Sequence, residues 1–128
     1  MILAILIISD DGTPIATIEA SEIEVDSSLI TGALRIAKEL ITSFTGMRKD
    51  SLELSDGMNR IIMHEIANHN CIIIFIVRDG NGIDEIKINH IVKLLEIYGF
   101  TEEIGSRIAN LAAKKPMDYR YLSWGAVW

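Results

Sequence analysis

The chain has 128 residues, the size of one domain, and 12 basic against 18 acidic residues give it a net charge of −6. This charge argues against a general nucleic-acid-binding protein, which needs a basic surface. The apolar segments are too short to span a bilayer, and no basic residue precedes the first one as it would in a signal peptide. The single cysteine, Cys71, has no partner for an intramolecular disulfide, so we expect a cytoplasmic protein.

Two segments are apolar at every position and predict the centre of a β-sheet. They are Ile2–Ile8 and Cys71–Val77. A strand that is apolar on both sides is covered on both faces, so we expect helices above and below the sheet. The two segments are therefore predicted to lie side by side as central strands, with Ile5 and Ile74 in the interior.

Turn and cap residues predict the elements after the first strand. Asp11 and Gly12 predict a hairpin into a strand over 15–19, and Pro14 at its start is typical of an edge strand. Asp26 is a good N-cap for a helix that ends at Gly46. The apolar stripe of this helix consists of Ile30, Ala33, Leu34, Ala37, Leu40, Ile41 and Phe44.

The second half of the chain predicts a meander of three strands followed by two helices. The strands are expected over 52–54, 58–66 and 71–77, and the first helix over 84–98. Gly99 suits the left-handed position just past that helix. Thr101 then caps the last helix, whose first turn carries two glutamates that favour a helix N-terminus.

The expected order is strand, strand, helix, strand, strand, strand, helix, helix. This order predicts an α/β protein of the α+β type, built as a three-layer α/β/α sandwich around a five-stranded, mostly antiparallel sheet. We expect one domain over residues 1–115 and a C-terminal tail over 116–128. The short strand with Leu52 and Leu54 is expected at an edge of the sheet, where unpaired backbone groups are open to a partner.

No motif in the sequence predicts catalysis, a cofactor or a metal. His64 and His69 are five residues apart rather than four, so they do not match the zinc-protease spacing. The loop with Gly80 and Gly82 carries no phosphate-binding lysine and is flanked by acidic residues, so we expect a tight turn. Cys71 opens a buried strand and is expected to be a small core residue.

The tail is unusual because half of the aromatic residues lie in its last ten positions. They are Tyr119, Tyr121, Trp124 and Trp128. Their spacing fits both a helical stripe and strand alternation, and the tail is expected to pack across its own domain or to anchor a partner. Together with Leu52 and Leu54, these four aromatic residues are the candidate interface residues.

The order of elements resembles the longin-like members of the longin and roadblock superfamily, which have a profilin-like fold. The resemblance covers about residues 1–113. It depends on the Ile2–Ile8 segment with its Asp11–Gly12 turn, the helix from Ser27, and the 52–77 meander followed by helices. Roadblock proteins usually place a further helix before the first strand, whereas this chain begins in that strand, which favours the longin side.

The resemblance implies a non-enzymatic platform for protein interactions, and the motifs of the sequence predict neither a cofactor nor a metal. Its implied partners are itself or a related longin or roadblock protein, and a small GTPase or a trafficking or signalling assembly. The net charge predicts no nucleic-acid partner, and the short apolar segments predict no direct membrane insertion, so we expect any membrane location to come through a partner. Two other classes stay open: a small-molecule sensor or regulatory domain, and an enzyme whose site forms across a dimer.

Overall fold

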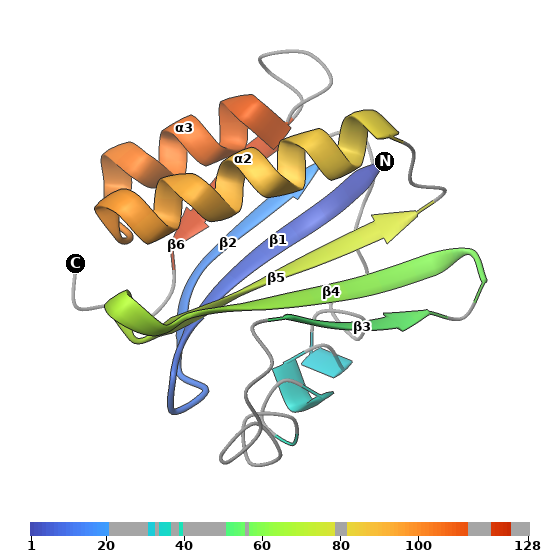
Figure 1. Cartoon of the computed structure of the whole chain (residues 1–128), viewed down its shortest axis with the longest axis horizontal. Helices are drawn as coiled ribbons and strands as arrows, with labels where there is room; N and C mark the ends of the chain where they lie inside the picture. Colours follow the sequence, from blue (N-terminus) through green and yellow to red (C-terminus); the bar gives the residue numbers. More distant parts are fainter. Residues whose placement is uncertain are drawn as a thin grey trace.

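The computed structural model describes most of the sheet and of the helices on one of its faces. It covers residues 1–20, 31, 32, 34–36, 39, 51–55, 57–78, 82–112 and 119–123. For residues 20 and 119–123 only the backbone is described. Six strands and two long helices make a mixed α+β protein (Figure 1). The strands are β1 (Ile2–Ser9), β2 (Pro14–Ala20), β3 (Ser51–Ser55), β4 (Asn59–Ile66), β5 (Cys71–Arg78) and β6 (Tyr119–Ser123).

The strands form one sheet in the order β3-β4-β5-β1-β2-β6. Each neighbouring pair is antiparallel. The two wholly apolar strands, β1 and β5, lie next to each other at the centre, with Ile5 opposite Phe75 and Leu6 opposite Ile74. This confirms their predicted placement. The five predicted strands all form, and a sixth, β6, extends the sheet beyond β2.

The prediction that β2 is an edge strand is wrong. β2 lies between β1 and β6, and β6 pairs with it from Ala16 to Ala20. Pro14 is compatible with this interior position because it lies two residues before the part that pairs with β6. The missing proline N–H therefore removes no hydrogen bond from the β2–β6 ladder.

The core divides into two clusters, one on each face of the sheet. Ile5 and Phe75 belong to the cluster under the two long helices, whereas Leu6 and Ile74 belong to the other cluster. Neighbouring residues of one strand point to opposite faces, so the central strands feed both clusters at once. This explains why they are apolar at every position, and why Ile5 and Ile74 are both fully buried.

Helices α2 (Gly82–Tyr98) and α3 (Glu102–Ala112) lie side by side over the same face of the sheet (Figure 1). Most of their buried side chains join the cluster of Phe75. Gly99 has a φ of 69°, and its N–H donates to the Leu95 carbonyl over 2.9 Å, as expected for the left-handed residue that ends α2. The Thr101 hydroxyl accepts a 3.1 Å hydrogen bond from the Ile104 N–H, which confirms it as the N-cap of α3.

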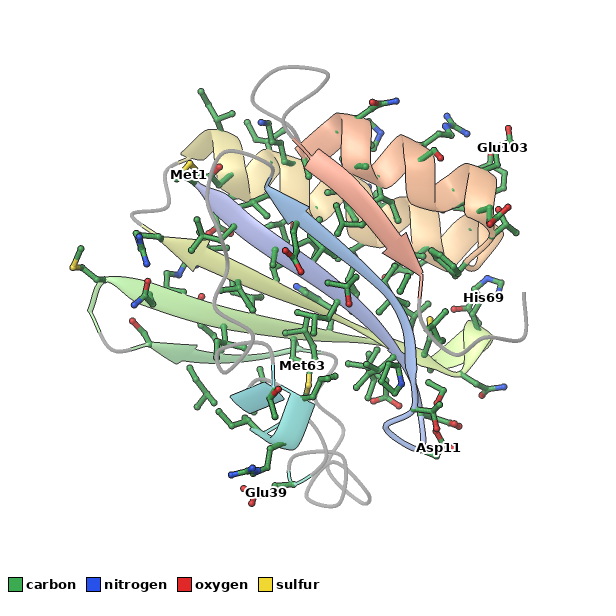
Figure 2. All side chains as sticks on the ribbon, turned by 180° about the vertical axis from the view of Figure 1, so that it is seen from behind. Met1, Asp11, Glu39, Met63, His69 and Glu103 are labelled. Atoms are coloured by element: carbon green, nitrogen blue, oxygen red, sulfur yellow. The ribbon has the colours of Figure 1, made fainter. Side chains whose placement is uncertain are left out.

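The opposite face of the sheet is in contact with part of the predicted first helix. Residues 31, 32, 34–36 and 39 are helical, and Leu34 packs against the cluster that contains Leu6 and Ile74. Figure 2 shows Met63 of β4 beside these helical residues and Glu39 on their outer side. Asp26, Gly46 and the other stripe residues of this helix lie outside the described residues.

A buried hydroxyl on β2 gives a stability prediction. Thr17 is fully buried opposite Leu6, and its Oγ1 has no hydrogen-bond partner among the described residues. An unsatisfied buried hydroxyl costs about 1–3 kcal/mol. We therefore expect Thr17→Val, which keeps the shape and removes the hydroxyl, to raise the free energy of unfolding by about 1 kcal/mol in urea denaturation. Thr17→Ser is the control and should lower it, and a Val variant less stable than wild type would show that the hydroxyl is satisfied.

Candidate functional site

The candidate interface residues lie at opposite edges of the sheet. Leu52 and Leu54 are in β3 at one edge, and Tyr119 and Tyr121 are in β6 at the other (Figure 1). Trp124 and Trp128 lie outside the described residues. The structure therefore places the two leucines together at one edge and the two tyrosines together at the other, and it keeps the leucines apart from the tyrosines. A strand that is added at one edge of the sheet therefore cannot pair with both β3 and β6.

The β3 edge has one neighbour among the described strands, which is β4. In this register Leu52 lies opposite Met63, and Leu54 lies opposite Ile61. Met63 and Ile61 belong to the cluster on the face turned away from α2 and α3, so the two leucines lie on that face as well. Leu52 is half-buried, whereas the Leu54 side chain is 41% exposed. Among the described residues, β3 thus combines an open backbone edge with an accessible apolar side chain.

An arginine on β4 links the β3 edge to α2. The Arg60 guanidinium donates to the Glu53 carboxylate of β3 over 2.6 Å and to the Glu85 carboxylate of α2 over 2.7 Å. The hydrogen bond to Glu53, followed by that to Glu85, raises the pKa of Arg60. Both carboxylates are about half exposed, so each pair adds at most about 1 kcal/mol to stability. The bridge thus links β3 to α2, whereas the ladder with β4 holds the strand in the sheet.

Part of the predicted tail, residues 119–123, forms a strand of the sheet. β6 pairs with β2 in a regular register that sets Leu122 opposite Thr17 and Tyr121 opposite Ile18. The backbone of residues 119–123 therefore packs on its own domain. Strand alternation, one of the two patterns that the tail sequence allowed, describes this segment.

The histidines and the cysteine do not form a reactive group. His64 stacks edge-to-face on Phe75 with ring centroids 6.4 Å apart, whereas His69 Nε2 lies 3.1 Å from the Glu96 carbonyl oxygen at the end of α2. Burial, with a smaller effect from Asp10, raises the pKa of the Cys71 thiol to about 11, so this thiol stays protonated at neutral pH. Gly80 and Asn81 lie outside the described residues, and Gly82 is the first residue of α2.

One exposed apolar surface, on α2, was not predicted from the sequence. Ile83, Ile86 and Ile97 of α2 have exposed fractions of 64%, 69% and 67%. Helical periodicity predicts an inner face made of Ile88, Ile91, Leu94, Leu95 and Tyr98. This is correct for the first four, which are buried, and wrong for Tyr98, which is 57% exposed. The available signal was the number of isoleucines in α2, because one face of a helix cannot hold all of them.

Comparison with known proteins adds no family to these observations. No protein-family model matches the chain, and no curated protein matches it. Within the described ranges, no group of three histidine, cysteine, aspartate or glutamate side chains could hold a metal ion. None of the described helices is both long and apolar enough to cross a membrane.

Proposed function

We propose that this chain is a non-enzymatic protein-interaction platform of the longin-like type, which pairs through the open edge of β3. The single observation behind this role is the accessible β3 edge, with Leu54 exposed beside it. An edge strand offers unpaired N–H and C=O groups that a second extended strand can satisfy. β3 of another copy, or of a related protein, would extend the sheet across the contact.

The three-layer sandwich is part of the same proposal. The helical residues around Leu34 contact the face opposite α2 and α3. A helix over 27–45 would cover that face and complete the strand, strand, helix order of the longin-like resemblance. Residues 1–115 would then form the longin-like domain, with residues 116–128 as its C-terminal extension.

The partners follow from the resemblance. We propose a second copy or a related longin or roadblock protein at the β3 edge, and a small GTPase or a trafficking or signalling assembly as the target of the dimer. The net charge of −6 is unfavourable for binding to nucleic acid or to anionic lipid. We therefore propose a cytoplasmic protein that reaches membranes only through its partner.

A proline in β3 tests the pairing. Leu54→Pro removes one backbone donor and stiffens the strand, so we expect the mass measured by light scattering at high micromolar concentration to fall toward that of the 14.3 kDa monomer. Leu54→Lys should have the same effect, because a charge at a strand edge opposes pairing.

The opposite edge provides the matched control. Leu122→Pro places the same substitution in β6, and it should leave the mass of the wild-type assembly unchanged if the variant folds. Circular dichroism melts of all three variants establish that they are folded. If folded Leu54→Pro and Leu54→Lys both keep the wild-type mass, β3 does not mediate association.

A further inference from the structure

The sequence of β3 reads the same in both directions. The strand has the sequence SLELS, which is a palindrome about Glu53. In the sequence the symmetry extends by one residue on each side, to Asp50 and Asp56. An antiparallel pair of identical strands, related by a two-fold axis, places each residue opposite its mirror image about that axis. A palindromic edge strand can therefore match a second copy of itself, apolar with apolar and polar with polar.

A second copy would continue both faces of the sheet across the contact. Leu52 and Leu54 lie on the face turned away from α2 and α3, opposite Met63 and Ile61 of β4. A two-fold axis perpendicular to the sheet keeps this face on the same side in both copies. With the axis at Glu53, each Leu52 lies opposite Leu54 of the other copy, and the exposed Leu54 side chain gains an apolar neighbour. The apolar rows that end at the edge of one copy thus run on into the other.

We propose that the partner at the β3 edge is a second copy of this chain, paired antiparallel about a two-fold axis at Glu53. This inference rests on the proposed pairing through β3, and it adds the identity of the partner and the register. An axis at Leu52 or at Leu54 would also keep the faces matched, but it would leave the other leucine opposite no residue of β3. Of these three registers, only the axis at Glu53 pairs all five residues and both leucines.

The charge at the axis limits the strength of the dimer. The two Glu53 side chains would face each other, and like charges directly opposite on neighbouring strands are destabilising. In each copy the Arg60 guanidinium lies 2.6 Å from the Glu53 carboxylate and 2.7 Å from that of Glu85. Two carboxylates against one guanidinium leave one negative charge in each copy, so Arg60 reduces the repulsion without removing it.

Neutralising this position should strengthen the dimer. We expect Glu53→Gln to lower the dissociation constant by up to about fivefold, because it removes the facing charges. Sedimentation equilibrium measures the constant, and Glu103→Gln, an exposed change on α3, is the control that should leave it unaltered. An unchanged or raised dissociation constant for folded Glu53→Gln would contradict an axis at this residue.

Single cysteines along β3 read the register directly. Directly opposite Cα atoms in an antiparallel pair are about 4.5–5.5 Å apart, within the about 4.4–6.8 Å that a disulfide spans. Only residue 53 lies opposite itself in the proposed register, so mild oxidation of Glu53→Cys should give a covalent dimer on non-reducing gels. Leu52→Cys and Leu54→Cys, each alone, place the two thiols on a diagonal with about 7–8 Å between the residues. They should stay at the level of Ser106→Cys, which measures random collision from exposed α3.

A mixture of two variants tests the same register with Glu53 in place. Ser51 would lie opposite Ser55 of the other copy, and a thiol is close in size to the hydroxyl that it replaces. We expect Ser51→Cys and Ser55→Cys to cross-link when they are mixed before oxidation, and not when each is oxidised alone. The native Cys71 is buried, with its thiol pKa raised to about 11, so it should not compete.

The outcomes separate the register, the partner and the edge. A covalent dimer from Leu52→Cys or Leu54→Cys alone, but not from Glu53→Cys, would overturn the axis at Glu53 and leave pairing through β3 standing. A wild type that is monomeric at high micromolar concentration, with no β3 cysteine above the Ser106→Cys level, would overturn the second copy as partner and leave the edge to a related protein. The same low cross-linking in a chain whose mass is that of a dimer would contradict pairing through β3 itself.

Discussion

Phe75→Ala should lower the free energy of unfolding by about 3–5 kcal/mol, the largest single effect expected in this protein. Phe75 is completely buried in the middle of β5, next to Ile5 of β1 and Ile62 of β4 in the register. It also lies beneath α2 and α3, and His64 packs against its ring. Truncation would leave a cavity that a sheet covered by helices cannot close, and urea denaturation followed by circular dichroism measures the loss.

Two other truncations show whether the loss follows burial. Ile74 is the next residue in β5 and lies in the cluster on the opposite face, so Ile74→Ala should also cost about 2–5 kcal/mol. Leu54→Ala is the control at a partly exposed position, and we expect it to cost less than about 1 kcal/mol. A Phe75→Ala melting curve close to that of wild type would contradict the central position of β5.

Gly99→Ala should lower the free energy of unfolding by about 2 kcal/mol or more, because two costs coincide at the end of α2. The φ of 69° is left-handed, which costs a residue with a Cβ about 1–2 kcal/mol. The new Cβ would also lie 2.8 Å from Nδ1 of His69. The His69 ring cannot simply turn away, because its Nε2 interacts with the Glu96 carbonyl at 3.1 Å, where Asn68 also donates.

Two other glycines separate these costs. Gly57 has a φ of 96° but nothing within 4 Å of an added Cβ, so Gly57→Ala measures the backbone cost alone. Gly82 has neither a positive φ nor a close neighbour, and Gly82→Ala should be neutral or stabilising by up to about 1 kcal/mol. Thermal or urea denaturation of the three variants gives the comparison. If Gly99→Ala costs no more than Gly57→Ala, the contact with His69 has no energetic consequence.

The elements with strong local signals could be predicted from the sequence. The all-apolar strands identified the centre of the sheet, because side chains that alternate between two covered faces must all be apolar. Gly12 and Gly99 marked a turn and a helix end that do require positive φ. Thr101 marked the start of α3 through a hydrogen bond that depends only on local spacing.

Features that depend on distant neighbours could not be predicted in the same way. Nothing near Pro14 indicates that a strand about 100 residues later will pair beyond it and make β2 an interior strand. The aromatic spacing in the tail fits two periods equally well, and only pairing with β2 selects the strand at residues 119–123. The exposed stripe on α2 was hidden because periodicity finds one apolar face, whereas this helix has two.

Hydrogen exchange of the β3 amides tests the central claim, pairing through an open sheet edge, most directly. In an isolated molecule the outward N–H groups of β3 have no partner among the described strands and should exchange rapidly. We predict that their protection increases with protein concentration, while amides of the central β5 stay protected at all concentrations. Rapid exchange of the outward β3 amides at every concentration, in a sample whose mass shows association, would contradict pairing through this edge.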